Sequence, residues 1–234
     1  MQNGNRLAAW YDRTIGRVIP RAHFFAMLFL PLFNILLYSL TQSLLTDIPR
    51  GSIALPIDGQ IPLIEEWVFV YFGCYVFWFG GLGLAARQSS QEFYRFFARV
   101  LPSLIIAYLF FVFFPLSIDR PEIVGEGLSA TIMRFLYAID PPHNLFPSLH
   151  CFFNWIVYIQ IRGKREYPLF FRLFACIFSF GVFASTLFTR QHYLLDTVAG
   201  VLLAELSGLI LLTPLPRMAE KLFSALNKKV FTGK

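Results

Sequence analysis

His192 and Asp196 are separated by four positions, a spacing that has chemical meaning on a helix. On an α-helix the two side chains lie on one stripe, about one turn apart. A carboxylate beside an imidazole fixes the tautomer and orientation of the ring and raises the basicity of the nitrogen that points away from it. The spacing therefore predicts that His192 is a nucleophile and that Asp196 orients it.

A second histidine, His150, follows Pro147 and Ser148 at the start of another apolar run. Proline suits the first turn of a helix and serine can cap it, so we expect a helix to begin here with free N–H groups. Such a helix end binds anions that carry several oxygens, phosphate above all. The guanidinium groups of Arg120 and Arg190 would add positive charge and hydrogen bonds to the same anion.

These side chains together predict a phosphoryl-transfer site that needs no metal ion and no cofactor. The residues expected to act in catalysis are His192, His150 and Asp196, and those expected to bind the substrate phosphate are Arg120, Ser148 and Arg190. Structural alternatives remain, because the histidines can be interfacial side chains, the arginines can extend to lipid head groups and the serine can be only a cap. A zinc site on the two histidines and the aspartate is a further alternative, although no fourth ligand has the usual spacing.

Two neighbouring polar side chains are excluded from the site. Glu205 follows Asp196 by nine positions, about half a turn around the helix, so we expect it to form a hydrogen bond between helices. Cys151 is adjacent to His150, and adjacent residues on a helix diverge by about 100°, so we expect the thiol to face apolar neighbours.

The elements that must position these residues are membrane helices. Of the 234 residues, 56% are hydrophobic, 18% are aromatic and only 15% are charged, whereas soluble domains contain about 25% charged residues. A lipid solvent accepts such a surface, so the composition predicts an integral membrane protein whose partner is the lipid bilayer. The net charge of +6 fits the basic cytoplasmic loops of membrane proteins, and we expect no nucleic-acid partner.

Six apolar runs are candidates for membrane-spanning helices, because a bilayer core of about 30 Å requires roughly 20 residues per helix. We expect an all-α, polytopic six-transmembrane-helix bundle as the catalytic domain over residues 23–213, between an N-terminal tail over 1–22 and a basic C-terminal tail over 214–234. The six runs are His23–Leu45, Glu66–Ala86, Phe97–Leu116, Leu145–Ile161, Pro168–Phe188 and His192–Leu212.

The distribution of positive charge predicts the orientation of these helices. Of the 20 Lys and Arg residues, only Arg50, Arg120, Arg134 and Arg190 fall in the first, third and fifth connections. The others fall in the two tails and at or near the second and fourth connections, which we therefore expect to be cytoplasmic. Three separate segments of the predicted site then meet at the outer face of the membrane.

The site residues also resemble a known family. The string Phe146-Pro147-Ser148-Leu149-His150, followed by Ser185 and then His192 and Asp196, resembles the type 2 phosphatidic acid phosphatase superfamily, whose pattern is PSxH and SRxxxxxHxxxD, preceded by KxxxxxxRP, on six membrane helices. The resemblance covers about residues 50–213. It implies that His192 forms a phosphohistidine, Asp196 orients it, His150 protonates the leaving oxygen, and Ser148 and Arg120 bind phosphate oxygens.

The chain departs from the family pattern at two cations. The lysine of the first motif would fall at Phe113 and the arginine of the third at Thr186, so Arg190 is the candidate to replace one of them. Three segments resemble the branch that includes inositol phosphorylceramide synthases, in which a head group passes to a lipid alcohol. These segments are Asn144 to His150, the pair His192-Tyr193, and Asp58 to Pro62.

We therefore expect a lipid-phosphate phosphatase acting on a substrate such as phosphatidic acid, phosphatidylglycerol phosphate or undecaprenyl pyrophosphate. Its compact loops suggest a bacterial plasma membrane, with the active site on the periplasmic or extracellular side; an endomembrane lumen is the alternative. Head-group transfer of the inositol phosphorylceramide synthase type is the first alternative function.

A lipid or proton-coupled transporter is an alternative of another class, because buried His and Asp pairs also serve proton relays. Its path to the cytoplasmic side would contain only Asn154, Gln160 and Glu205 as polar residues of the fourth and sixth spans. A purely structural membrane subunit would not need the cluster at the outer face. The sequence makes no prediction of the oligomeric state.

Overall fold

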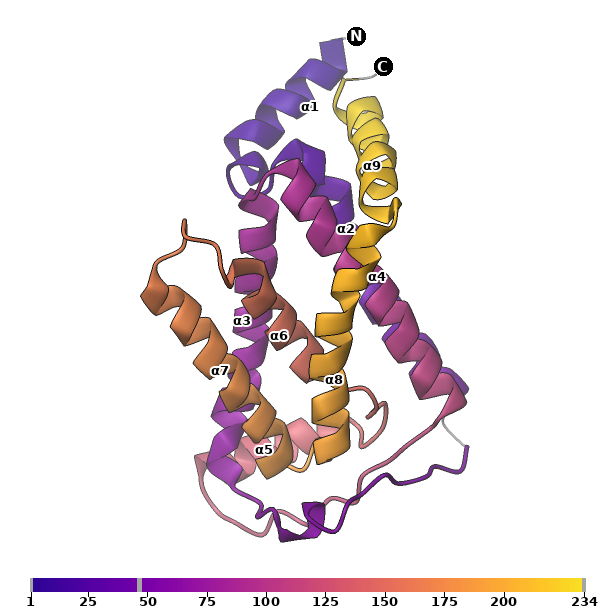
Figure 1. The fold of residues 1–234 in the computed structure, drawn as a ribbon, viewed down its shortest axis with the longest axis vertical. Helices are drawn as coiled ribbons and strands as arrows, with labels where there is room; N and C mark the ends of the chain where they lie inside the picture. The colour runs from indigo at the N-terminus through magenta and orange to yellow at the C-terminus, as the bar shows by residue number, and fades with distance from the viewer. Residues whose placement is uncertain (1, 46–47, 233–234) are drawn as a thin grey trace. The chain divides into compact units, whose positions relative to one another are not determined.

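The computed structural model describes residues 2–45 and 48–232, and its regular elements are helices (Figure 1). These residues contain no strand and only isolated bridges, such as that between Gly51 and Leu116. The expected all-α fold class is therefore confirmed. The α-helices are α1 Gln2–Arg13, α2 Phe24–Leu44, α3 Val68–Arg87, α4 Ser90–Phe113, α5 Leu128–Ile139, α6 Leu149–Ile161, α7 Leu169–Phe188, α8 Leu194–Leu206 and α9 Leu215–Thr232.

Within the described ranges, five helical segments are long and apolar enough to cross a membrane, which indicates an integral membrane protein. They are Arg21–Leu44, Glu65–Arg87, Ser90–Phe113, Leu169–Phe188 and Leu194–Leu212; the last joins α8 to the 3-10 turn η5, Ser207–Leu212. The run expected over Leu145–Ile161 forms the shorter α6, whose 13 residues extend about 20 Å. A sixth crossing by α6 stays a prediction.

Helix α4 begins earlier than the apolar pattern predicts. It starts at Ser90 instead of Phe97. Ser89, the residue before the helix, accepts the Glu92 N–H at its Oγ at 3.3 Å. A serine that accepts from the first turn is a helix-start signal. A search for apolar residues passes over this polar first turn, which explains the difference.

Helix α5 was not predicted at all, because its 12 residues are too few for a membrane span. Ala130, Met133 and Leu136 recur every third position and are fully buried, in a cluster that also contains Val68 and Tyr71 of α3. This spacing is typical of a helix that buries one face. Figure 1 shows α5 beside the first turns of α3.

The chain divides into two compact units. Unit 1 comprises Met1–Tyr38, Phe79–Leu104 and Leu206–Lys234, and unit 2 comprises Ser39–Trp78 and Ile105–Glu205. In unit 1, α1 packs against α9. His23 of unit 1 is buried, with Nδ1 2.9 Å from the carbonyl oxygen of Ala86 and Nε2 3.1 Å from Ser90 Oγ.

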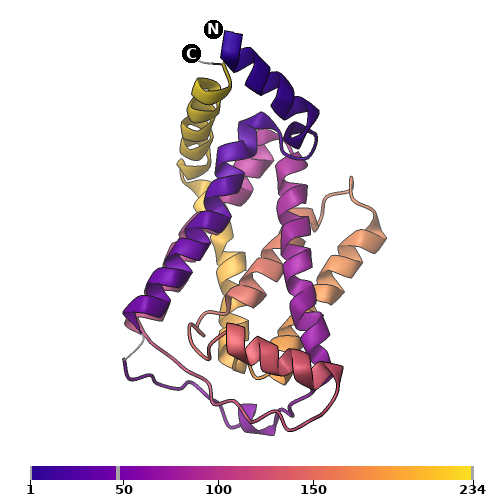
Figure 2. The same ribbon diagram turned by 180° about the vertical axis from the view of Figure 1, so that it is seen from behind.

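Unit 2 contains α5, α6 and α7 together with most of α8, and α6 packs along α7. The connections before α3 and before α5 run side by side, joined at Gly51 and Leu116 (Figure 2). Asp58 in the first connection is buried, and its Oδ1 accepts the Leu194 N–H at 2.9 Å. This bond ties the connection to the start of α8, next to the predicted site.

Candidate active site

His192 lies in the short turn between α7 and α8. Its backbone N–H donates to the carbonyl oxygen of Thr186 at 3.1 Å, which extends the end of α7 into the turn. Its Nδ1 is 3.3 Å from Oδ2 of Asp196, which is fully buried in the first turn of α8. Asp196 Oδ2 also accepts the Tyr193 N–H at 2.9 Å. The ring and the carboxylate are therefore neighbours as predicted, although His192 lies two residues before α8 instead of on one helical stripe with Asp196.

His150 lies in the first turn of α6, which Ser148 caps. Ser148 Oγ accepts the Cys151 N–H at 3.3 Å, and the Ser148 N–H donates to the carbonyl oxygen of Asp196 at 3.0 Å. His150 Nδ1 is 3.3 Å from His192 Nε2, and the two ring centroids are 5.5 Å apart. His150 at the start of α6 and His192 in the turn before α8 therefore face each other through one nitrogen each.

A glycine permits this approach of α6 to α8. A Cβ on Gly200 of α8 would collide with the carbonyl oxygen of Ser148 and would lie 3.1 Å from Cys151 Cβ and 3.2 Å from Phe152 N. Small residues at such crossings allow helix backbones in membranes to come close. Gly200 therefore sets how near the two histidine-bearing helix starts can lie.

The other nitrogen of His150 faces α3. Nε2 is 2.7 Å from the hydroxyl of Tyr71 and 3.4 Å from that of Tyr75. The Tyr71 hydroxyl donates to Asp140 Oδ2 at 2.8 Å. Tyr71 and Asp140 were not predicted as site residues. They come from separate segments with no motif spacing between them, so only their contact in the fold reveals them.

Arg120 lies beside this cluster. Its Nη1 donates to the carbonyl oxygen of Asp140 at 2.6 Å and its Nη2 to Gln191 Oε1 at 2.6 Å. Its guanidinium carbon is 4.7 Å from the ring centre of Tyr137, which adds a cation–π contact. Burial raises the pKa of Tyr137 to about 12, so its hydroxyl is neutral at physiological pH and donates to the Thr189 carbonyl at 3.1 Å.

Arg190 precedes His192 in the same turn and adopts a positive φ of 53°, which is uncommon for a residue with a side chain. Its Nη1 donates to the carbonyl oxygen of Asp58 at 2.7 Å, and its Nη2 donates to that of Ile61. Both acceptors are neutral backbone oxygens. Phosphate binding by Arg190 stays a prediction.

The two positions that depart from the family pattern lie in different surroundings. Thr186 is fully buried in α7, where its hydroxyl donates to the Phe183 carbonyl at 2.8 Å and lies 3.4 Å from Thr197 Oγ1 of α8. Phe113 ends α4 and is 70% exposed. Neither side chain provides a cation. Arg120 bonds Gln191 in the turn before α8, and Arg190 lies in that turn itself.

Glu205 forms the hydrogen bond between helices that was expected of it. Its Oε1 accepts from Trp155 Nε1 of α6 at 2.7 Å, and its carboxylate pairs with Arg162. For the zinc alternative, no three His, Cys, Asp or Glu side chains in the described ranges lie together as a ligand set.

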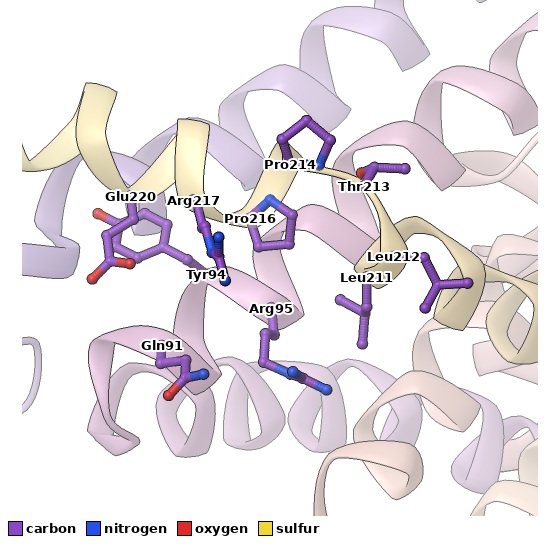
Figure 3. A pocket seen from close by; sticks show the side chains of 10 residues that line it. All are labelled: Gln91, Tyr94, Arg95, Leu211, Leu212, Thr213, Pro214, Pro216, Arg217 and Glu220. Atoms are coloured by element: carbon purple, nitrogen blue, oxygen red, sulfur yellow. The ribbon is translucent and has the colours of Figure 1, made fainter.

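A cavity of about 350 Å³ lies elsewhere, in unit 1 (Figure 3). Its lining includes Arg95 of α4, Arg217 and Glu220 of α9, and apolar side chains around Leu212. None of the predicted site residues lines it, so we base the candidate site on the contacts of the two histidines.

Comparison with known proteins identifies the family. A family model described as the PAP2 superfamily matches residues 37–210, which contain every predicted site residue. No curated protein and no solved structure matched this chain.

Proposed function

The chain belongs to the PAP2 superfamily, as the resemblance to type 2 phosphatidic acid phosphatases predicts, and from this membership we propose that it is a lipid-phosphate phosphatase. Members of the superfamily are generally phosphatases and phosphotransferases, which supports an enzyme acting on phosphate esters. The finer proposal is hydrolysis of a lipid phosphomonoester or pyrophosphate through a phosphohistidine. The observation that carries it is the 3.3 Å contact between His150 Nδ1 and His192 Nε2.

In the first half of the proposed reaction, His192 Nε2 attacks phosphorus. The N–P bond forms while the bond from phosphorus to the lipid oxygen breaks, and His150 Nδ1 gives its proton to that oxygen. Asp196 holds the Nδ1–H of His192 and stabilises the positive charge that the ring gains. Because the two nitrogens are in contact without substrate, the phosphate must separate them.

In the second half, a water molecule attacks the phosphohistidine. His150 Nδ1 takes a proton from the water, the N–P bond breaks, and inorganic phosphate leaves with His192 restored. The charge on the phosphoryl oxygens would be stabilised by Arg120, Arg190 and the first N–H groups of α6 at Ser148. Hydrogen bonds from each guanidinium to phosphate oxygens would be stronger than its bonds to backbone carbonyls, because charged pairs bond more strongly.

We further propose that α6 completes a sixth crossing and that both tails are cytoplasmic. The concentration of Lys and Arg near the tails and near the second and fourth connections supports this orientation. The site then faces the periplasmic or extracellular side of a bacterial plasma membrane. A lipid substrate would enter from the outer leaflet with its chains between helices.

Purified protein in detergent tests the proposal directly. We expect phosphate release from short-chain phosphatidic acid, phosphatidylglycerol phosphate or undecaprenyl pyrophosphate in the presence of a chelator. His192→Ala is expected to abolish it. Full activity in that variant would overturn the assignment of the nucleophile, and loss of activity with chelator would overturn metal independence.

Head-group transfer to a lipid alcohol is a second candidate. The segment Asp58 to Pro62, which resembles transferases, contacts the His192 turn through Asp58 and Leu194 and through Arg190 and Ile61. This candidate predicts little phosphate release without an acceptor lipid and a new phosphodiester when the acceptor is present. Tracking free phosphate and lipid products in one assay separates the two reactions.

A further inference from the structure

The proposed acid–base residue has a chain of contacts on the side away from the nucleophile. Tyr71 Oη is 2.7 Å from His150 Nε2 and 2.8 Å from Asp140 Oδ2. We infer that Tyr71 and Asp140 are positioning residues that keep a proton on His150 Nε2, so that Nδ1 is the nitrogen that exchanges the catalytic proton. This inference rests on the proposed function and adds two residues to it.

The direction of each hydrogen bond follows from the number of protons available. A tyrosine hydroxyl has one proton, and an ionised carboxylate can only accept. The Tyr71 proton therefore goes to Asp140, and the oxygen of Tyr71 accepts from His150 Nε2–H. This tautomer leaves Nδ1 of His150 directed at His192.

His192 has a matching arrangement on its own far side. Its Nδ1 lies 3.3 Å from Asp196 Oδ2, so the proton on that nitrogen is directed outward as well. With both outer nitrogens protonated, the two inner nitrogens at 3.3 Å would present only lone pairs to each other. A proton taken up between them would resolve this conflict, and its positive charge would be flanked by the carboxylates of Asp140 and Asp196.

Substrate then divides this pair into an acid and a nucleophile. As phosphate enters between the rings, the shared proton stays on His150 Nδ1 and the lone pair stays on His192 Nε2. The proton passes to the leaving lipid oxygen in the first half, and a proton from water restores it in the second. The proton on His150 Nε2 never leaves, because Tyr71 and Asp140 hold it.

The packing of α5 explains why these groups are fixed. Tyr71 is fully buried against Met133 and Leu136, and the Asp140 N–H donates to the carbonyl oxygen of Leu136 at the end of the same helix. The contacts of α5 thus place both the hydroxyl and the carboxylate. Arg120 bonds the backbone carbonyl of Asp140, and the Oδ2 of that carboxylate accepts from Tyr71.

The groups that face His150 are few and come from separate elements. Tyr71 and Tyr75 face it from α3, and Asp140 contributes from the end of α5. The charged or titratable groups on the remaining sides are His192 and Arg120. Tyr75 is 3.4 Å from the same nitrogen, so its replacement is a matched control for the loss of a nearby hydroxyl.

The tautomer can be measured without any assay of activity. The chain has 4 histidines, so ¹⁵N NMR of histidine-labelled protein, assigned with single variants, resolves His150. With no proton between the two rings, we expect Nε2–H at His150 in the wild type and in Tyr75→Phe, and a mixture of tautomers in Tyr71→Phe. A proton on Nδ1 in the wild type would overturn the inference even in an active phosphatase.

Kinetics then test the consequence. Tyr71→Phe keeps the packed ring and is expected to lower kcat on short-chain phosphatidic acid about 10- to 100-fold with little change in KM. The limb of the pH profile that belongs to His150 should shift, and Asp140→Asn should shift it in the same direction. The first-turnover burst with an aryl phosphate, whose leaving group needs no acid, should be nearly unchanged in Tyr71→Phe.

The outcomes separate the two proposals. Equal losses in Tyr71→Phe and Tyr75→Phe, or an equal loss on both substrates with an unmoved pH profile, would reduce Tyr71 to a packing residue. Absence of phosphate release from the wild type, with the expected tautomer present, would overturn the proposed function and leave the inferred hydrogen-bond chain intact.

Discussion

Two buried histidines, one in each unit, differ in what their ring nitrogens face. His23 of unit 1 has a carbonyl and a hydroxyl as partners, and its ring stacks on Phe93 with centroids 4.1 Å apart. His192 of unit 2 has a carboxylate on one nitrogen and the ring of His150 on the other. Burial alone therefore does not distinguish the proposed catalytic histidine from a histidine with ordinary packing and hydrogen bonds. A nitrogen whose partner is another titratable ring is available to a substrate, whereas a nitrogen bonded to ordinary acceptors or donors is not.

The largest effect is expected from His192→Ala. Loss of a nucleophile that forms a covalent intermediate lowers kcat by about 10⁴-fold or more. The measurement is phosphate release by purified protein, together with trapping of the phosphorylated enzyme, whose N–P bond is stable to base and labile to acid; this trapped form should disappear.

His23→Ala is the matched control for that variant. Loss of its two hydrogen bonds is expected to destabilise the protein by about 1–3 kcal/mol, seen as a lower thermal unfolding midpoint. The kcat of the remaining folded protein should be unchanged. A folded His23→Ala protein without activity would break the comparison between the two histidines.

A smaller loss is expected from Asp196→Asn. The amide can still accept the Tyr193 N–H, but it removes the negative charge that stabilises the His192 imidazolium, so kcat should fall about 10²- to 10⁴-fold. Glu205→Gln changes a second carboxylate of the same helix, one that bonds Trp155 instead of a histidine. It should leave kcat unchanged, and similar losses in both variants would contradict a specific role for Asp196.

Local patterns in the sequence predicted those contacts of the site that join residues only three or four positions apart. The cap at Ser148 was found as predicted. His192 and Asp196 are neighbours as predicted, but His192 lies in the turn before α8 and not on one helical stripe with Asp196, so the turn as well as the helix sets their distance. Of the six apolar runs predicted as spans, five correspond to described helical segments long enough to cross a membrane. The roles of these residues in catalysis stay predictions that kinetics must test.

Contacts between distant segments were not predictable in this way. Tyr71 looks like any aromatic residue of an apolar run, and Asp140 looks like any acidic loop residue. Their link to His150 depends on α5, a helix too short for a search based on membrane thickness. Arg190 is predicted to bind phosphate. In the structure it bonds the carbonyl oxygen of Asp58, and no sequence spacing predicts that contact.

Glycines offer a finer comparison of the two units. An added Cβ at Gly200 in unit 2 would meet the start of α6, whereas one at Gly83 in unit 1 would meet nothing within 4 Å. Gly200→Ala should destabilise the protein by about 1–3 kcal/mol and lower kcat about 10-fold, because overpacking separates the two histidine-bearing helix starts. Gly83→Ala should preserve both the unfolding midpoint and kcat. Equal behaviour of the two variants would show that helix spacing does not limit the reaction.

The smallest effects concern two tyrosines, one in each unit, whose pKa values burial raises to about 12 from 10.0. A raised pKa means that the folded state favours the neutral hydroxyl, so the stability that Tyr11 and Tyr137 contribute is complete below pH 10.0 and is lost as pH approaches about 12. Tyr11→Phe and Tyr137→Phe should each flatten the fall of the unfolding midpoint over this range.

Only Tyr137→Phe should also lower kcat/KM at neutral pH, by a few-fold, because its hydroxyl holds the Thr189 carbonyl in the turn before His192. A change in kcat/KM caused by Tyr11→Phe would mean that activity depends on packing in unit 1 as well. The proposal that only unit 2 takes part in the reaction would then be wrong.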